Sequence, residues 1–117
     1  MTNAVYVGSP GFPGKVTVVT GTVHTESRQV KPLPLRLDLA NHSPTGFAWG
    51  YGGSGPAQLA LAILADTVSD ELALKWHQHF KMRFLSTLDG DQPFQLPRSM
   101  VVEFVLAMEE KEKKVGE

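Results

Sequence analysis

The feature that most constrains the fold of this chain is a change of hydrophobic period at a glycine-rich turn near its middle. Before the turn, runs of β-branched and alternating apolar residues are typical of strands. After it, apolar residues recur every three or four positions, as in helices buried on one side. Strands followed by helices predict an α+β fold, with a small antiparallel sheet from the N-terminal half packed against about three C-terminal helices.

Four segments before the turn predict strands. Residues 4–7 are apolar and end at a cluster of glycines and prolines. Residues 15–25 are rich in β-branched side chains, and Gly21 makes them either one strand or a hairpin. Alternating leucines predict a half-buried edge strand over residues 33–39. Residues 47–49 predict one more short strand.

Three helices are predicted after the turn. Pro56 suits the first position of the first helix, with Ser54 or Gly55 as its cap. We predict that Ser69 caps the second helix. Two acidic residues follow it in the first turn, where the positive end of the helix dipole favours negative charge. Pro97 opens the third helix after a short strand. The three apolar faces comprise Leu59, Ala60, Ile63 and Leu64; Leu72, Ala73, Trp76, Phe80 and Phe84; and Met100, Val101, Phe104, Val105 and Met108.

The length of 117 residues suits one domain with a core of its own. The short strand before the third helix covers residues 94–96, and residues 109–117 predict a frayed, solvated end. We therefore assign residues 1–110 to a single α+β domain and residues 111–117 to a charged C-terminal tail.

Composition excludes several classes of function. The formal net charge of −1 gives no general attraction to nucleic acid or anionic lipid. The absence of cysteine removes disulfides, thiolate metal sites and thiol catalysis, and suits a reducing compartment. No apolar run is long enough to span a bilayer, and the first residues do not resemble a signal peptide. We expect a cytoplasmic protein without a membrane partner, whose oligomeric state the sequence leaves open.

The glycine spacing of the turn matches three known motifs only in part. Gly50, Gly52 and Gly55 have the spacing of a dinucleotide-binding loop, but the parallel βαβ unit that this motif requires is not predicted. Pro56 and Ala57 stand where a phosphate-binding Walker A loop has Lys and Ser or Thr. A nucleophile elbow at Ser54 would need glycine where Pro56 stands.

The remaining prediction for the turn is a binding loop at a helix start. Free backbone amides there favour an anion, and nearby aromatic rings favour a base or an aromatic ligand. The alternative is that the glycines only permit close packing or positive φ, while the aromatic side chains cover the sheet. The candidate ligand-binding residues are Asn41, His42, Ser43, Trp49, Tyr51, Gly53, Ser54 and Gly55.

The histidines give little support for metal binding or catalysis. His77 and His79 are two positions apart on a predicted helix, so they point in nearly opposite directions and do not share a metal. His42 could form a triad with Ser43 or Ser54 and Asp38, although triads are recognised by geometry. We assign no catalytic residue, no metal ligand and no cofactor.

The stretch Asn41–Asp66 resembles a domain family of unknown function from bacteria, their phages and plasmids, marked by NHSPxGFxWGYGGSGPAQLALAIL. Every defined position of that motif is matched here. Ala48 stands where the pattern often carries an acid, which disfavours a catalytic carboxylate there. The resemblance extends more loosely over Tyr6, Gly8 and the two following helices. It implies no activity, but it suggests an accessory protein of a mobile element that binds host proteins or nucleic acids.

The sequence thus predicts a non-enzymatic binding module that holds a phosphate-bearing ligand, such as a nucleotide, or nucleic acid through the glycine-rich loop. The first alternative is a protein-binding modulator or inhibitor of a host enzyme, with Trp49, Tyr51 and an exposed sheet face as its interface. The second alternative is a small hydrolase that uses His42.

Overall fold

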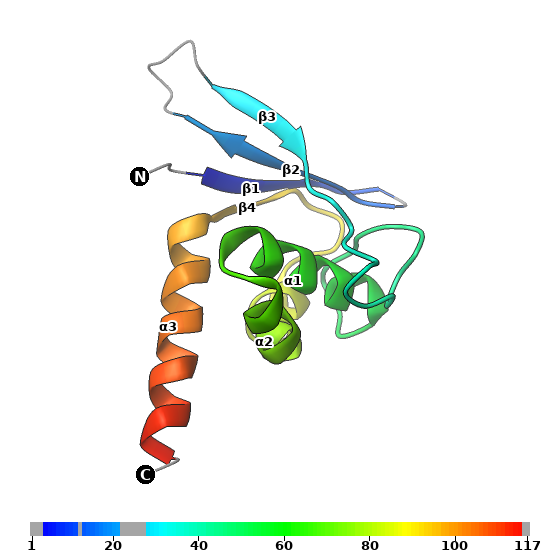
Figure 1. Ribbon diagram of the computed structural model, residues 1–117. Helices are drawn as coiled ribbons and strands as arrows, with labels where there is room; N and C mark the ends of the chain where they lie inside the picture. Colours follow the sequence, from blue (N-terminus) through cyan, green and yellow to red (C-terminus); the bar gives the residue numbers. More distant parts are fainter. Residues whose placement is uncertain (1–3, 12, 22–27, 116–117) are drawn as a thin grey trace.

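The computed structural model describes residues 4–11, 13–21 and 28–115 and confirms the α+β class. All three helices lie on one side of a sheet (Figure 1). The elements in chain order are β1 (Ala4–Ser9), β2 (Lys15–Thr20), β3 (Gln29–Pro32), α1 (Ser54–Thr67), α2 (Asp70–Arg83), the short 3₁₀ helix η1 (Leu85–Thr87), β4 (Phe94–Pro97) and α3 (Arg98–Val115).

The sheet is antiparallel throughout, with strand order β3-β2-β1-β4. Tyr6 in β1 is opposite Val18 of β2 and Leu96 of β4, and all three side chains are buried on the helix side. The predicted strand at residues 94–96 is therefore confirmed as β4. This strand comes from the C-terminal half and completes a sheet whose other three strands precede the glycine-rich turn.

Helix α1 is the centre of the core. The six residues from Leu59 to Leu64 are all fully buried, because α1 lies between the sheet and α2. A helix that is apolar around its whole circumference is stable only when it is covered on every side. The expectation of a largely buried first helix is confirmed.

Helix α2 begins as predicted. The Ser69 hydroxyl accepts the Leu72 amide at 3.1 Å, which is the expected N-cap bond. The Phe80 ring lies 5.0 Å from that of Phe84 and 5.2 Å from that of Phe104. This aromatic cluster joins α2 to α3.

A polar cluster around the buried Tyr6 ties the sheet to both α1 and α3. The Tyr6 hydroxyl donates to the Asp66 carboxylate at 2.7 Å and lies 2.6 Å from the Thr67 hydroxyl. Arg98 donates to the same carboxylate at 2.7 Å and to the Tyr6 oxygen at 3.3 Å. Burial of the phenol and its bond to Asp66 raise the pKa of Tyr6 to about 12, although its bonds with Thr67 and Arg98 act in the opposite direction.

The prediction of a strand at residues 33–39 is wrong. Leu33 still donates to the Val16 carbonyl at 3.0 Å, but the pairing stops there. Arg36 adopts a left-handed conformation with φ 58°, and Leu39 donates to the Arg36 carbonyl in a turn. The leucines alternate in sequence, yet the left-handed residue turns the chain out of the sheet. The third strand is instead β3, in a polar segment to which we assigned no structure.

Other boundaries also differ from the predictions. Residues 47–49 form no strand and make a single bridge, between Phe47 and Gly14. Helix α1 begins at Ser54 with Gly53 as its N-cap, so Pro56 is the third helical residue, which still needs no amide donor. Strand β2 ends at Thr20, before Gly21 with φ 98°, and residues 22–25 of the predicted strand lie outside the described residues.

The expected frayed end is helical as far as Val115. Lys75 of α2 binds Glu109 at 2.8 Å and Glu112 at 2.6 Å, and these bonds hold the last turns of α3 beside α2. Among the helices of the described ranges, none combines the length and the apolarity that crossing a membrane requires.

Candidate functional site at the start of helix α1

The glycine-rich loop before α1 is packed against the segment that follows η1. The Gly50 amide donates to the Leu85 carbonyl at 2.9 Å. Gly50 has φ 92°, and a Cβ there would lie 2.5 Å from the amide nitrogen of Gly90. Lys81 of α2 donates to the Gly52 carbonyl at 3.1 Å. The loop therefore has a defined position, and Gly50 is required by its backbone.

The first amides of α1 are unpaired within the described part of the chain. Gly53 makes no side-chain cap, and the first helical bond runs from the Ala57 amide to the Gly53 carbonyl at 3.1 Å. No carbonyl or side chain of a described residue accepts from the amides of Gly53, Ser54 or Gly55. Such amides point outward along the helix axis and carry partial positive charge.

A cavity of about 230 Å³ lies in front of this helix end. Four hydroxyl-bearing residues, Ser43, Thr45, Tyr51 and Ser54, are part of its wall. The Ser43 hydroxyl donates to the Gly46 carbonyl at 2.7 Å, so it is already engaged within the loop. Among the described residues, the lining is Gly11, Pro13, Ser43, Thr45, Gly46, Phe47, Ala48, Tyr51, Ser54 and Gly55.

Tyr51 separates this cavity from a second one. Its side chain is 52% exposed and lines both hollows, together with Gly11 and Ala48. The second cavity has a volume of about 430 Å³ and extends to Gly90 and Asp91. A partly accessible aromatic ring thus lies beside the helix start and packs against Gly53, where a Cβ would lie 2.4 Å from Cε2 of Tyr51.

Half of the eight predicted ligand-binding residues line the first cavity: Ser43, Tyr51, Ser54 and Gly55. Gly53 is the N-cap residue of α1. The other three do not line the cavity. Sequence reasoning missed Thr45 and Gly46, and also Gly11 and Pro13, which only the fold brings to this cavity.

Trp49 is a core residue. Its side chain is 3% exposed, and its ring meets that of Phe94 edge-on at 4.8 Å between centroids. The indole nitrogen donates to the Gln92 carbonyl at 3.0 Å. This side chain therefore has no face on which a base could stack, and it is not part of an exposed interface.

Asn41 and His42 do not line the cavity, and a buried glutamine of α1 anchors the loop that carries His42 and Ser43. The fully buried Gln58 accepts the amides of His42 at 2.8 Å and Ser43 at 3.0 Å through Oε1. Its Nε2 donates to the carbonyls of Leu35 and Ala40 at 2.6 and 3.1 Å. All four hydrogen-bonding positions of this amide are used. The signal in the sequence is one glutamine inside an apolar helical run.

His42 pairs with a second histidine. Its Nε2 lies 3.0 Å from Nε2 of the buried His77, whose Nδ1 lies 2.9 Å from the Ala73 carbonyl. Because a carbonyl only accepts, Nδ1 of neutral His77 carries the proton and its Nε2 accepts from His42. Burial lowers the pKa of His77, bonds from its ring to the backbone oppose this shift, and the nearby His42 lowers the pKa further.

The contacts of the described residues contain no Ser-His-Asp triad. The Asp38 carboxylate binds Arg36, at 3.1 Å to Nε and 3.0 Å to Nη2, and Ser43 donates to Gly46. No cluster of three or more metal-ligating side chains occurs in the ranges that the structure covers. His79 is exposed and its ring packs against that of Trp76, so it lies on a different face of α2 from the buried His77.

Comparison with known families finds a match to a family of unknown function, DUF6166, over residues 12–107. No curated protein and no solved structure matches the chain.

Proposed function

We propose that this chain, which belongs to the family of unknown function DUF6166, is a non-enzymatic binding module that holds a phosphate-bearing ligand at the start of α1. The observation that carries the proposal is that a cavity of about 230 Å³ is lined by Ser54 and Gly55, two residues whose amides find no acceptor among the described residues. The amino end of a helix attracts phosphate oxygens through such amides.

The distribution of charge favours a small ligand over an extended nucleic acid. Among the described residues, no Lys or Arg lines the cavity, so the helix end supplies the attraction there. Arg36, a basic residue shortly before the candidate loop, binds the carboxylates of Asp38 and Asp70. A nucleotide suits the site because the exposed Tyr51 ring offers a stacking face next to the helix start.

The setting of this function is proposed from the sequence alone. The motif at residues 41–66 supports an accessory protein of a phage or other mobile element, and the absence of cysteine supports the cytoplasm. The alternative of a protein-binding module is favoured by a different observation, a groove between α2 and α3.

The test is a titration of inorganic phosphate, ATP and a short single-stranded oligonucleotide, followed by amide chemical shifts and tryptophan fluorescence. We expect saturable shifts confined to residues 50–57 with ATP. The Ser54→Pro variant removes one free amide at a position where proline is well tolerated, because Ser54 is the first helical residue and Gly53 is extended. The matched Ser54→Ala variant removes only the hydroxyl.

Binding should be lost in Ser54→Pro and retained in Ser54→Ala, with both variants folded. Flat titrations with all three probes would overturn the proposal. Equal affinity in wild type and Ser54→Pro would also overturn it, because the ligand would then not depend on the helix amides.

A further inference from the structure

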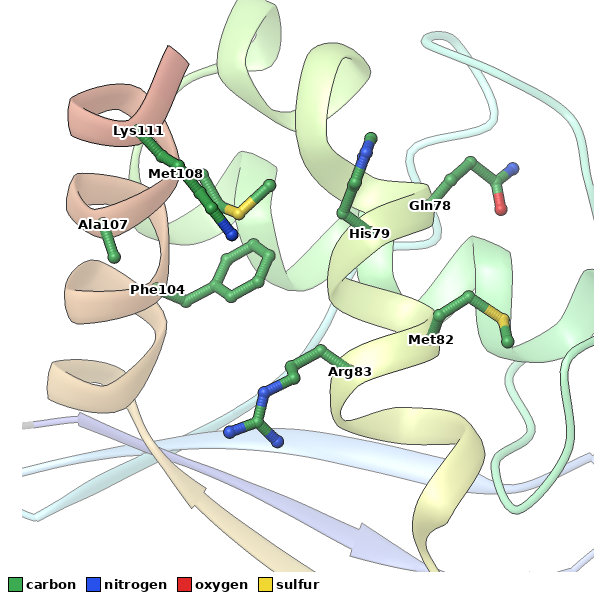
Figure 2. Close-up of a pocket in the computed structure, with 8 residues that line it drawn as sticks. All are labelled: Gln78, His79, Met82, Arg83, Phe104, Ala107, Met108 and Lys111. Carbon is green, nitrogen blue, oxygen red and sulfur yellow. The ribbon is translucent and has the colours of Figure 1, made fainter. Parts of the chain in front are cut away.

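A groove of about 720 Å³ lies between α2 and α3 (Figure 2). The two helices are held together at one end by Lys75 with Glu109 and Glu112, and near the sheet by the Phe80, Phe84 and Phe104 cluster. The groove is lined by Gln78, His79, Met82, Arg83, Phe104, Ala107, Met108 and Lys111.

The floor of the groove is apolar and continuous with the core. Phe104 and Met108 of α3 are partly buried and pack against core residues. The Met82 side chain on α2 is 57% exposed and points away from α3, whereas Ala107 is a small side chain on the α3 wall (Figure 2). Methionine side chains adapt to different apolar partners, so such a floor suits a variable apolar surface.

Both walls of the groove carry a cation. Arg83 belongs to α2 and Lys111 to α3, and Figure 2 shows their side chains reaching over the space between the helices. No carboxylate of a described residue lines the groove. Within the described ranges, neither Arg83 nor Lys111 forms an ion pair, whereas Lys75 on the same α2 helix has two. The Arg83 guanidinium lies over the Phe84 ring at 5.0 Å, so both cations lack a carboxylate partner in the part of the chain that the structure describes.

We propose that this groove docks an acidic amphipathic helix of a partner protein. A helical segment with apolar residues every three or four positions fills a groove between two helices, and carboxylates beside that stripe meet Arg83 and Lys111. The charge of the rim is what selects the partner, since a chain with net charge −1 has no general attraction for acidic proteins. The inference does not depend on a ligand at α1.

The test starts from a displayed library of random peptides of about four helical turns, panned against the full chain. An enriched peptide is labelled with fluorescein, and its affinity is measured by anisotropy. We expect acidic sequences with apolar residues at helical spacing. Arg83→Glu and Lys111→Glu should each weaken peptide binding by about tenfold. A peptide in which lysine replaces the glutamates should again bind the Arg83→Glu, Lys111→Glu double variant.

The matched control is Lys113→Glu, an equal charge reversal on an exposed part of the same helix outside the groove. It should change the affinity by less than about twofold. Circular dichroism and urea midpoints verify that every variant is folded. Ser54→Pro should leave peptide binding unchanged, which separates this result from the fate of the α1 site.

Three results would overturn the proposal. The first is a library that yields no enriched peptide. The second is enrichment of sequences that are not acidic. The third is an enriched peptide that binds the Arg83→Glu, Lys111→Glu double variant as tightly as the wild type.

Discussion

The Nε2 atoms of His42 and His77 lie 3.0 Å apart, with His77 buried and its Nδ1 bonded to the Ala73 carbonyl. Burial holds the pKa of His77 below the ordinary value of 6.5, against the opposing effect of its backbone bonds. As the pH falls below 6.5, His77 therefore takes up a proton more readily in the unfolded chain than in the folded chain.

We expect the free energy of unfolding to fall as pH is lowered through this window. Urea unfolding between neutral pH and pH about 5 measures the effect. His77→Gln should reduce the pH dependence, and His79→Gln, which removes an exposed histidine of the same helix, provides the control. A stability that is equal at both ends of the window would contradict the assignment.

Tyr6 gives a prediction at the basic end of the pH scale. Its folded pKa of about 12 exceeds the ordinary value of 10.0. The stability from this neutral phenol is present below pH 10.0 and is lost as pH rises toward 12, because the unfolded chain releases the proton first. The phenolate absorbance of Tyr51→Phe, in which Tyr6 is the one remaining tyrosine, reports the folded pKa. A midpoint near the ordinary value while the protein is folded would contradict the buried bond to Asp66.

Gln58→Leu should destabilise the fold by about 2–4 kcal/mol, because it leaves the amides of His42 and Ser43 and two carbonyls without their partner. Urea midpoints measure this loss. Gln78→Leu is the matched control, since Gln78 is exposed and the same exchange there should cost less than about 0.5 kcal/mol. Equal effects of the two exchanges would show that the Gln58 bonds contribute nothing to stability.

Gly50→Ala should cost about 2 kcal/mol or more, because the φ of 92° and the nearby backbone of Gly90 both exclude a Cβ. Gly52→Ala is the control within the same loop. A Cβ at Gly52 would first meet the flexible Met82 sulfur, at the ordinary distance of 3.5 Å. Thermal unfolding should separate the two variants clearly, and a stable Gly50→Ala protein would mean that the loop can move away from Gly90.

The helical half of the fold was predictable from the sequence because its signals are local. The Ser69 cap, the apolar faces of α2 and α3 and the apolar run of α1 each depend on residues within a few turns of one another. The α+β class follows because strand-like hydrophobic patterns precede helix-like ones along the chain. The glycine-rich loop was correctly placed at a helix start for the same reason.

The tertiary structure decided what depends on contacts distant in sequence. The leucines of residues 33–39 have the period of a strand, but Arg36 turns the chain and Gln58 holds its Leu35 and Ala40 carbonyls. Trp49 is buried and Tyr51 is exposed, although both are aromatic residues of one loop. The pairing of His42 with His77 and the groove between α2 and α3 follow from how the helices pack. Sequence periodicity records which face of an element is apolar, whereas the neighbour that covers this face is chosen only when the whole chain packs.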